Sequence, residues 1–211
     1  MRVNTGRGLL IVLALLLAGT SSAAGQVDSS KLVVTANILD RQYFCAAGSD
    51  MMTLQLRVRL RYTNAGNQKL ILYRGEDLFY QAKIRPVSVR DGARPYEIVV
   101  LNARYLEVEN EPVEQPAPGR LFVILQPGAS YEAETTVGVG VVGQNSPRAR
   151  HAIFEGEHTL QLLVVTWYRS RNLAEKLRER WQRKGSLWYS PVATNEMTFR
   201  AERPQLTQPC K

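Results

Sequence analysis

The sequence contains few of the residues that mark specialised protein classes. Its 211 residues include two cysteines, 15 glycines and 10 prolines. That is too little cysteine for a disulfide-dense miniprotein, and too little glycine and proline for a collagen-like or disordered chain. With 45% hydrophobic and 22% charged residues, the composition is that of an ordinary globular protein. The length suits one domain with a core large enough to be stable without metal.

The motifs of common enzyme families are absent as well. The sequence has no G-x-S-x-G nucleophile elbow, no H-E-x-x-H zinc motif, no phosphate loop and no glycine-rich dinucleotide fingerprint. His151 and His158 are its two histidines, and the acidic run of residues 107–114 lacks the tight turn that wraps calcium. We predict a protein that is not an enzyme and that uses no cofactor and no metal. A hydrolase that uses His151 or His158 is an alternative.

Apolar runs long enough to span a bilayer are missing, and the one marked apolar run lies near the N-terminus. Arg2 and Arg7 precede the apolar residues 9–18 and the small residues 19–25, which is the layout of a secretory signal peptide. The apolar run is about half of the roughly 20 residues that span a bilayer. We therefore predict a signal peptide at residues 1–25 and one exported domain, periplasmic or extracellular, at residues 26–211.

The two cysteines lie near the two ends of that exported domain. Cys45 and Cys210 are not arranged as C-x-x-C, and an oxidising compartment favours a disulfide between them. A bridge across so long a loop is worth roughly 4 to 5 kcal/mol in the chain-entropy model. We predict a structural disulfide.

Strict alternation of apolar and polar residues identifies two long strands, at residues 54–62 and 131–142. Residues 64–67 have the composition of a turn, so that residues 54–62 and 69–73 form a hairpin or a sandwich corner. Residues 143–156 are expected to be a loop. Further strands are expected at residues 31–39, 82–90, 96–106, 121–125, 158–168 and 190–201. Many short strands separated by glycine or proline turns indicate an antiparallel β-sandwich.

Two turn motifs carry a resemblance to a known family. An N-x-G turn follows the first alternating strand at residues 64–66, and an L-x-P-G-x-S-x-E sequence enters the second at residues 125–132. The pattern resembles bacterial exported immunoglobulin-like β-sandwich domains, including the type first described as a proteinase-inhibitor domain. The resemblance implies an antiparallel immunoglobulin-like sandwich and assigns no functional residue.

One segment departs from the β pattern. Leu173, Leu177 and Trp181 recur at a spacing of four, Asn172 is a good N-cap, and Gly185 is placed to end a helix. We predict a short amphipathic helix at residues 173–184, as an insertion of residues 172–184 before the last strand.

This insertion is the candidate binding surface. All three tryptophans lie in it or beside it, and residues 169–184 contain seven basic and two acidic residues. They supply five of the six net positive charges left from +8 once Arg2 and Arg7 are removed. The candidate binding residues are Trp167, Arg171, Lys176, Arg180, Trp181, Arg183 and Trp188.

Three interpretations of this surface remain open. The helix can dock on the sandwich with a solvated charged face, bind an anionic partner such as a protein, glycan or cell-wall polymer, or lie on an anionic membrane surface, which we favour less. Nucleic acid is not expected for an exported chain. We predict a non-enzymatic binding or structural protein of the cell envelope or extracellular space. A secreted inhibitor or accessory subunit of another exported protein is an alternative.

Overall fold

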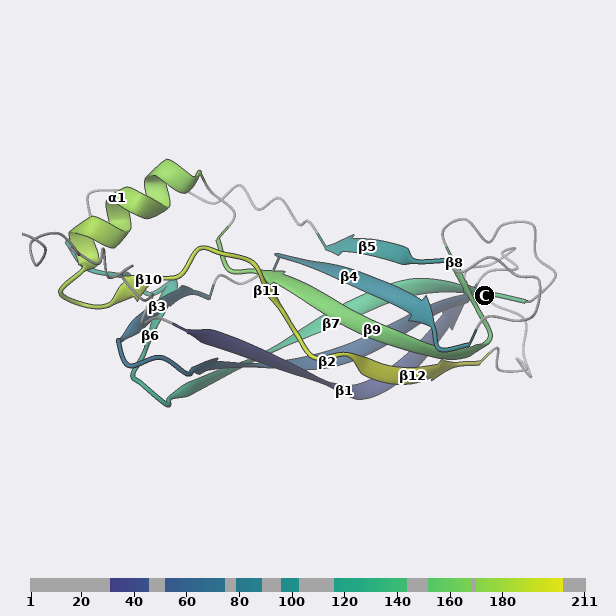
Figure 1. Cartoon of the computed structure of the whole chain (residues 1–211). Helices are drawn as coiled ribbons and strands as arrows, with labels where there is room; N and C mark the ends of the chain where they lie inside the picture. Colours follow the sequence, from purple (N-terminus) through teal and green to yellow (C-terminus); the bar gives the residue numbers. More distant parts are fainter. Residues whose placement is uncertain are drawn as a thin grey trace, which may run out of the picture.

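The computed structural model describes residues 31–45, 52–74, 79–88, 96–102, 116–143, 152–167 and 170–202. These residues form a mostly β structure with one helix and three sheets (Figure 1). Most neighbouring strands are antiparallel, so the expected all-β class is confirmed.

Two larger sheets contain most of the strands. The first has the order β1-β2-β7-β8 and consists of β1 (Leu32–Cys45), β2 (Met52–Asn64), β7 (Ser130–Val142) and β8 (Ala152–Phe154). The second has the order β11-β9-β4-β5, with β12 also paired to β9, and consists of β4 (Phe79–Pro86), β5 (Ile98–Asn102), β9 (Gly156–Val165), β11 (Val192–Ala193) and β12 (Met197–Ala201).

A third, small sheet lies with the helix at one end of the molecule (Figure 1). Its order is β10-β3-β6, with β3 (Leu70–Tyr73), β6 (Phe122–Leu125) and β10 (Ser186–Leu187). Helix α1 (Arg171–Trp181) lies next to it. Within the part of the chain that the structure describes, no helix is long and apolar enough to cross a membrane.

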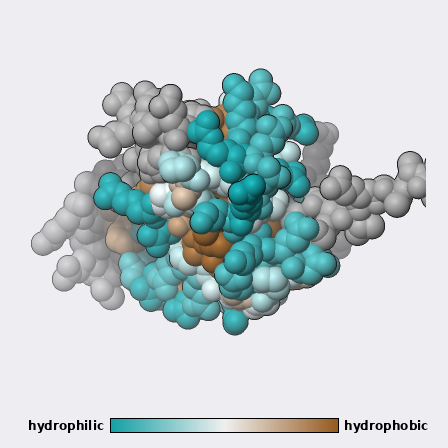
Figure 2. All heavy atoms as spheres, turned by 90° about the vertical axis from the view of Figure 1, so that its left-hand side faces the viewer, coloured by the Kyte–Doolittle hydropathy of each residue, from teal (hydrophilic) through white to brown (hydrophobic). Residues whose placement is uncertain are grey.

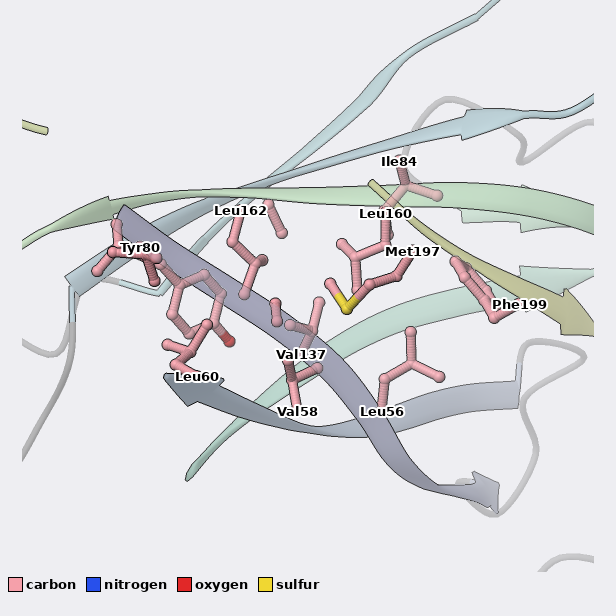
Figure 3. Close-up of a cluster of buried hydrophobic side chains, with 14 of the residues drawn as sticks. Leu56, Val58, Leu60, Tyr80, Ile84, Val137, Leu160, Leu162, Met197 and Phe199 are labelled. Atoms are coloured by element: carbon pink, nitrogen blue, oxygen red, sulfur yellow. The ribbon is translucent and has the colours of Figure 1, made fainter. Parts of the chain in front are cut away.

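The main core lies between the two larger sheets, as the alternation in β2 and β7 predicts. The residues of β2 that alternate with its arginines are buried, among them Leu56, Val58 and Leu60. They point toward side chains of β4, β9 and β12 (Figure 3). Burial of each such aliphatic side chain contributes about 1.5 to 3 kcal/mol.

The buried Asn64 joins the two turns that the sequence singles out. Its side-chain amide donates to the carbonyl of Leu125 at 3.0 Å and accepts from the N–H of Gly66 at 3.0 Å. Its backbone N–H donates to Ala129 at 3.0 Å, and its backbone carbonyl accepts from Gly128 at 2.8 Å. Because buried polar groups need such partners, Asn64 ties the N-x-G turn to the turn that precedes β7.

The chain therefore turns a corner at Asn64 instead of forming a hairpin. β2 pairs with β1 and β7, whereas β3 pairs with β6 and β10 in the small sheet. Of the two arrangements that the sequence allowed, the structure has the corner.

Asn195 connects the two larger sheets at the edge of β1. Its side-chain oxygen accepts from the N–H of Ala36 at 2.8 Å, and its side-chain nitrogen donates to the carbonyl of Ala36 at 3.1 Å. The amide of one side chain thus takes the place of a neighbouring strand at this position. It occupies backbone groups that would otherwise be open to edge pairing.

Two more contacts continue this connection along β1. Arg41 donates to the carbonyl of Arg200 at 3.0 Å, and the N–H of Glu202 donates to the hydroxyl of Tyr43 at 2.9 Å. The two residues of each pair, like Ala36 and Asn195, are 159 positions apart in the chain. A constant separation means that β1 and the segment containing β12 run parallel, which Figure 1 also shows.

The helix begins and ends earlier than the sequence pattern predicts. Ser170, not Asn172, is the N-cap, and its hydroxyl accepts from the N–H of Leu173 at 3.3 Å. The helix ends at Trp181 and a turn follows. Gly185 follows the turn with a φ of +155°, and an added Cβ there would lie 2.8 Å from the carbonyl oxygen of Lys69.

Three short strands differ from the sequence expectation. β8 lies inside the expected loop of residues 143–156, β10 was not expected, and the expected last strand is divided into β11 and β12. The division has a physical cause. Thr194 is held to Leu162 of β9 through its backbone N–H at 2.8 Å and its hydroxyl at 3.1 Å, while the next residue, Asn195, reaches β1.

Several expectations fall outside the described residues. They are the signal peptide at residues 1–25, the acidic run of residues 107–114, His151 and Cys210. Cys45 ends β1 and is not a free thiol. Its bridge to Cys210 stays a prediction.

Candidate functional site

A second hydrophobic cluster, the helix core, fixes α1 on the small sheet. Its buried members are Ile71, Trp167, Ala174, Leu177, Trp181 and Leu187. The ring of Trp181 packs edge-on against Phe122 of β6 with centroids 5.0 Å apart. The indole N–H of Trp167 donates to the carbonyl of Ser170 at 3.2 Å, just before the helix.

The tryptophans that we predicted as binding residues are therefore packing residues in this structure. Trp167 is 7% exposed and Trp181 is 2% exposed, so neither presents its ring to a partner. Trp188 is half-buried against the main core, and its indole N–H donates to Ser190 at 2.7 Å. The docking of the helix on the β structure, the first of the three interpretations, accounts for these rings.

The predicted basic residues are exposed on the helix and on the turn that follows it. Arg171, Lys176, Arg180 and Arg183 are all exposed. Arg171 forms an ion pair with Glu175 at 2.9 Å, and this hydrogen bond, with Tyr189 nearby, raises the pKa of Arg171. An exposed pair of this kind contributes little to stability.

The fold brings three more basic residues to the helix. Lys69 precedes β3 and accepts a backbone hydrogen bond from Ser186 at 2.8 Å, close to the end of the helix. Arg74 follows β3, and its guanidinium donates to the carbonyl of Arg120, just before β6, at 2.9 Å. All three basic side chains are exposed. Sequence reasoning missed them because their relation to α1 depends on the pairing of β3 with β6 and β10.

We call this exposed set the basic end. It contains nine basic and two acidic residues: Lys69, Arg74, Arg120, Arg171, Glu175, Lys176, Arg178, Glu179, Arg180, Arg183 and Lys184. Elsewhere in the described ranges, eight basic residues are balanced by eight acidic ones. The excess charge of the described chain is therefore confined to the end of the molecule that contains α1.

The arginine stripe of β2 does not form a second site of this kind. On the outer face of the first sheet, Arg59 pairs with Glu134 at 3.1 Å and approaches Glu132 at 3.9 Å. The same register places Arg61 opposite Glu132. Acidic residues of β7 thus offset part of this stripe.

His158 is buried, and both of its ring nitrogens have hydrogen-bond partners. It is 2% exposed, its Nε2 lies 3.0 Å from the hydroxyl of Tyr96, and its Nδ1 lies 3.1 Å from the carbonyl of Gly156. Burial lowers its pKa, while the bond to Gly156 raises it less. The ring stacks on Phe199 at 5.6 Å. A histidine with both nitrogens engaged and no access to solvent does not support a hydrolase that uses it.

The other reactive groups of the described residues do not form a catalytic constellation. The hydroxyl of Tyr62 is buried without a hydrogen-bond partner, and burial raises its pKa. Within the described ranges, no three histidine, cysteine, aspartate or glutamate residues are placed to hold a metal ion.

No protein-family model matches the chain, and no curated protein matches it. Three solved structures are similar at low levels. A Bordetella pertussis protein described as ApaA is 13% identical with a TM-score of 0.32, covering 83% of this chain and 97% of its own. A structural-genomics target is 10% identical with a TM-score of 0.34, covering 84% and 89%.

The third similar structure is a β-glucosidase involved in saponin metabolism from intestinal bacteria. It is 16% identical with a TM-score of 0.31, and the match covers 82% of this chain but 16% of the enzyme. At these TM-scores the similarities assign neither a fold family nor a function.

Proposed function

We propose that this chain is an exported, non-enzymatic binding or structural protein of the cell envelope or extracellular space, and that its basic end contacts an anionic partner. The two facing sheets and the corner at Asn64 support an immunoglobulin-like arrangement. The signal-peptide pattern of residues 1–25 supports export.

The observation that carries the proposal is the uneven distribution of charge. The basic end contains nine basic and two acidic residues, and the charges of the other described residues sum to zero. A surface of one sign raises the local concentration of oppositely charged partners and increases their rate of association. The tryptophans beneath it hold the helix in place, so that the charges are displayed on a fixed element.

Dextran sulfate is a suitable probe because it offers negative charge without a specific shape. The variant Lys176→Glu/Arg183→Glu reverses one exposed residue of α1 and one of the turn that follows it, without touching the helix core. We expect it to bind dextran sulfate at least tenfold more weakly than the natural chain at low salt, with the difference shrinking as salt screens the interaction.

The matched control reverses two basic residues on the outer faces of the larger sheets, Arg57→Glu/Lys83→Glu. It changes the net charge by the same amount and should retain most of the binding. Equal losses in the two variants would show that total charge, and not the basic end, drives association, and would overturn the proposal.

A further inference from the structure

The small sheet leaves an apolar patch uncovered beside the basic residues. Figure 2, which faces this end, shows a small area of hydrophobic residues with hydrophilic residues around it. Ile124 of β6 is 40% exposed although it lies opposite the fully buried Ile71 of β3. An aliphatic side chain this exposed on a strand is thus placed among cationic groups.

The order of the strands explains why Ile124 is not covered. α1 packs over β10 and β3, where Leu187 and Ile71 belong to the helix core. β6 is the strand at the other edge of the sheet. Its Phe122 contacts Trp181, but Ile124 is not in the helix core.

The helix cannot itself supply an apolar face to a partner. Ala174, Leu177 and Trp181 are buried against the small sheet, so the outward side of α1 is charged. In the described residues of α1 and the small sheet, Ile124 is the large apolar side chain that is exposed, so it is placed to make an apolar contact with a partner.

We infer that the basic end docks on an anionic lipid surface, with Ile124 entering the headgroup region. This inference rests on the proposed function and names the partner. A lipid surface offers phosphate groups to the cations and hydrocarbon to Ile124, whereas a soluble polyanion gains nothing from an aliphatic side chain.

The positions of the cations favour the same partner. Lys69, Arg120 and Arg183 come from three separate segments, next to β3, β6 and α1 respectively. Mobile lipid headgroups can adjust to cations placed in this way. Basic residues near an anionic leaflet attract it within about one Debye length, roughly 8 to 10 Å at 0.1 to 0.15 M salt.

The test is co-sedimentation of the full exported chain with vesicles. Phosphatidylcholine vesicles with and without phosphatidylglycerol are the probes. We expect binding that requires phosphatidylglycerol and weakens with salt. Ile124→Ser should reduce vesicle partitioning about tenfold and leave dextran sulfate binding unchanged. Only the lipid surface can bury the apolar side chain of Ile124.

The matched control is Val99→Ser, since Val99 is 44% exposed on β5, in a different sheet. It should change neither measurement, and circular dichroism checks that both variants fold. Absence of vesicle binding, or binding that ignores Ile124, would overturn the lipid assignment. If dextran sulfate binding persists in that case, the proposed function stands and the partner is a soluble polyanion or an acidic protein. If the natural chain does not bind dextran sulfate either, both proposals fail.

Discussion

The contacts of His158 define its neutral tautomer. The carbonyl of Gly156 can only accept, so Nδ1 carries the proton, and Nε2 accepts from the hydroxyl of Tyr96. That hydroxyl in turn accepts from the N–H of Phe154 at 3.3 Å. A second proton on the ring would place an unpaired charge in a buried site and would take the acceptor away from Tyr96.

Acid should therefore destabilise the fold through His158. Its folded-state pKa lies below the ordinary value of 6.5 because the ring is desolvated, so the unfolded chain binds more protons as the pH falls through 6.5. The stability that His158 supports is complete above that pH and decreases below it. Urea midpoints at pH 7.5 and pH 5.0 measure this loss.

The variant His158→Gln provides the comparison for this pH effect. Glutamine can keep one of the hydrogen bonds but does not titrate in this range. We expect a lower urea midpoint at neutral pH and a smaller change between the two pH values. An unchanged pH dependence in the variant would assign the acid sensitivity to other groups.

Residue-level prediction from sequence succeeded where a periodic pattern was present and failed where a role depends on distant partners. The buried face of β2 follows from strict alternation, and Leu56 and Val58 lie on it as expected. Asn64 was recognised as a turn residue, but its hydrogen bond to Leu125 links positions 61 residues apart and leaves no local signal.

At the scale of the elements, α1 depends on the helix core for its position. It has 11 residues, a length at which an isolated helix is marginal in water. Trp181→Ala would remove a 2% exposed ring that packs against Phe122. We expect a loss of about 3 to 5 kcal/mol in the free energy of unfolding.

Lys176→Ala is the control for this substitution, because Lys176 is exposed on the same helix. It should change stability by no more than about 0.5 kcal/mol. Urea denaturation followed by fluorescence and by circular dichroism measures both variants. Similar stability of the two would mean that the helix core does not hold the helix in place.

The strands missed from sequence are short ones. β10 has two residues and β8 has three, too few to show a period of two. The helix was recognised from the spacing of Leu173, Leu177 and Trp181, but its boundaries were not. Ser170 and Asn172 are both good capping residues, and Ser170 is the one that caps the helix.

At the scale of the whole molecule, the parallel course of β1 and β12 supports the predicted disulfide. Tyr43 contacts Glu202. Tyr43 lies two residues before Cys45, and Glu202 lies eight residues before Cys210. We expect no free thiols in the exported chain and two after reduction in denaturant, measured by thiol titration. Two free thiols without reduction would contradict the bridge.

Removal of both cysteines should lower the stability without changing the sheets. Cys45→Ser/Cys210→Ser would release the constraint on the unfolded chain, which we expect to cost about 2 to 5 kcal/mol. The natural chain under reducing conditions is the comparison, because it lacks the bridge but keeps both sulfurs. Equal urea midpoints for the oxidised and reduced natural chain would show that the bridge does not stabilise the fold.

Sequence reasoning located six of the nine basic residues of the candidate site. The cations of residues 171–184 were apparent because they lie in one short segment of the chain, and the tryptophans indicated that this segment is unusual. The chain does not reveal that Lys69, Arg74 and Arg120 join them, because that requires the pairing of β3 with β6 and β10. It also does not reveal that the tryptophan rings face inward, since an amphipathic helix can use the same residues for packing or for a partner.

The course of β1 and β12 also determines how the molecule can be attached to another object. Both strands finish at the end opposite α1 (Figure 1). A tag or surface joined to the chain after β12 would leave the cations directed away from the attachment point, whereas coupling through Lys69, Lys176 and Lys184 of the basic end would consume them. Immobilised molecules should therefore bind phosphatidylglycerol when held from the first side and lose that capacity when held from the second.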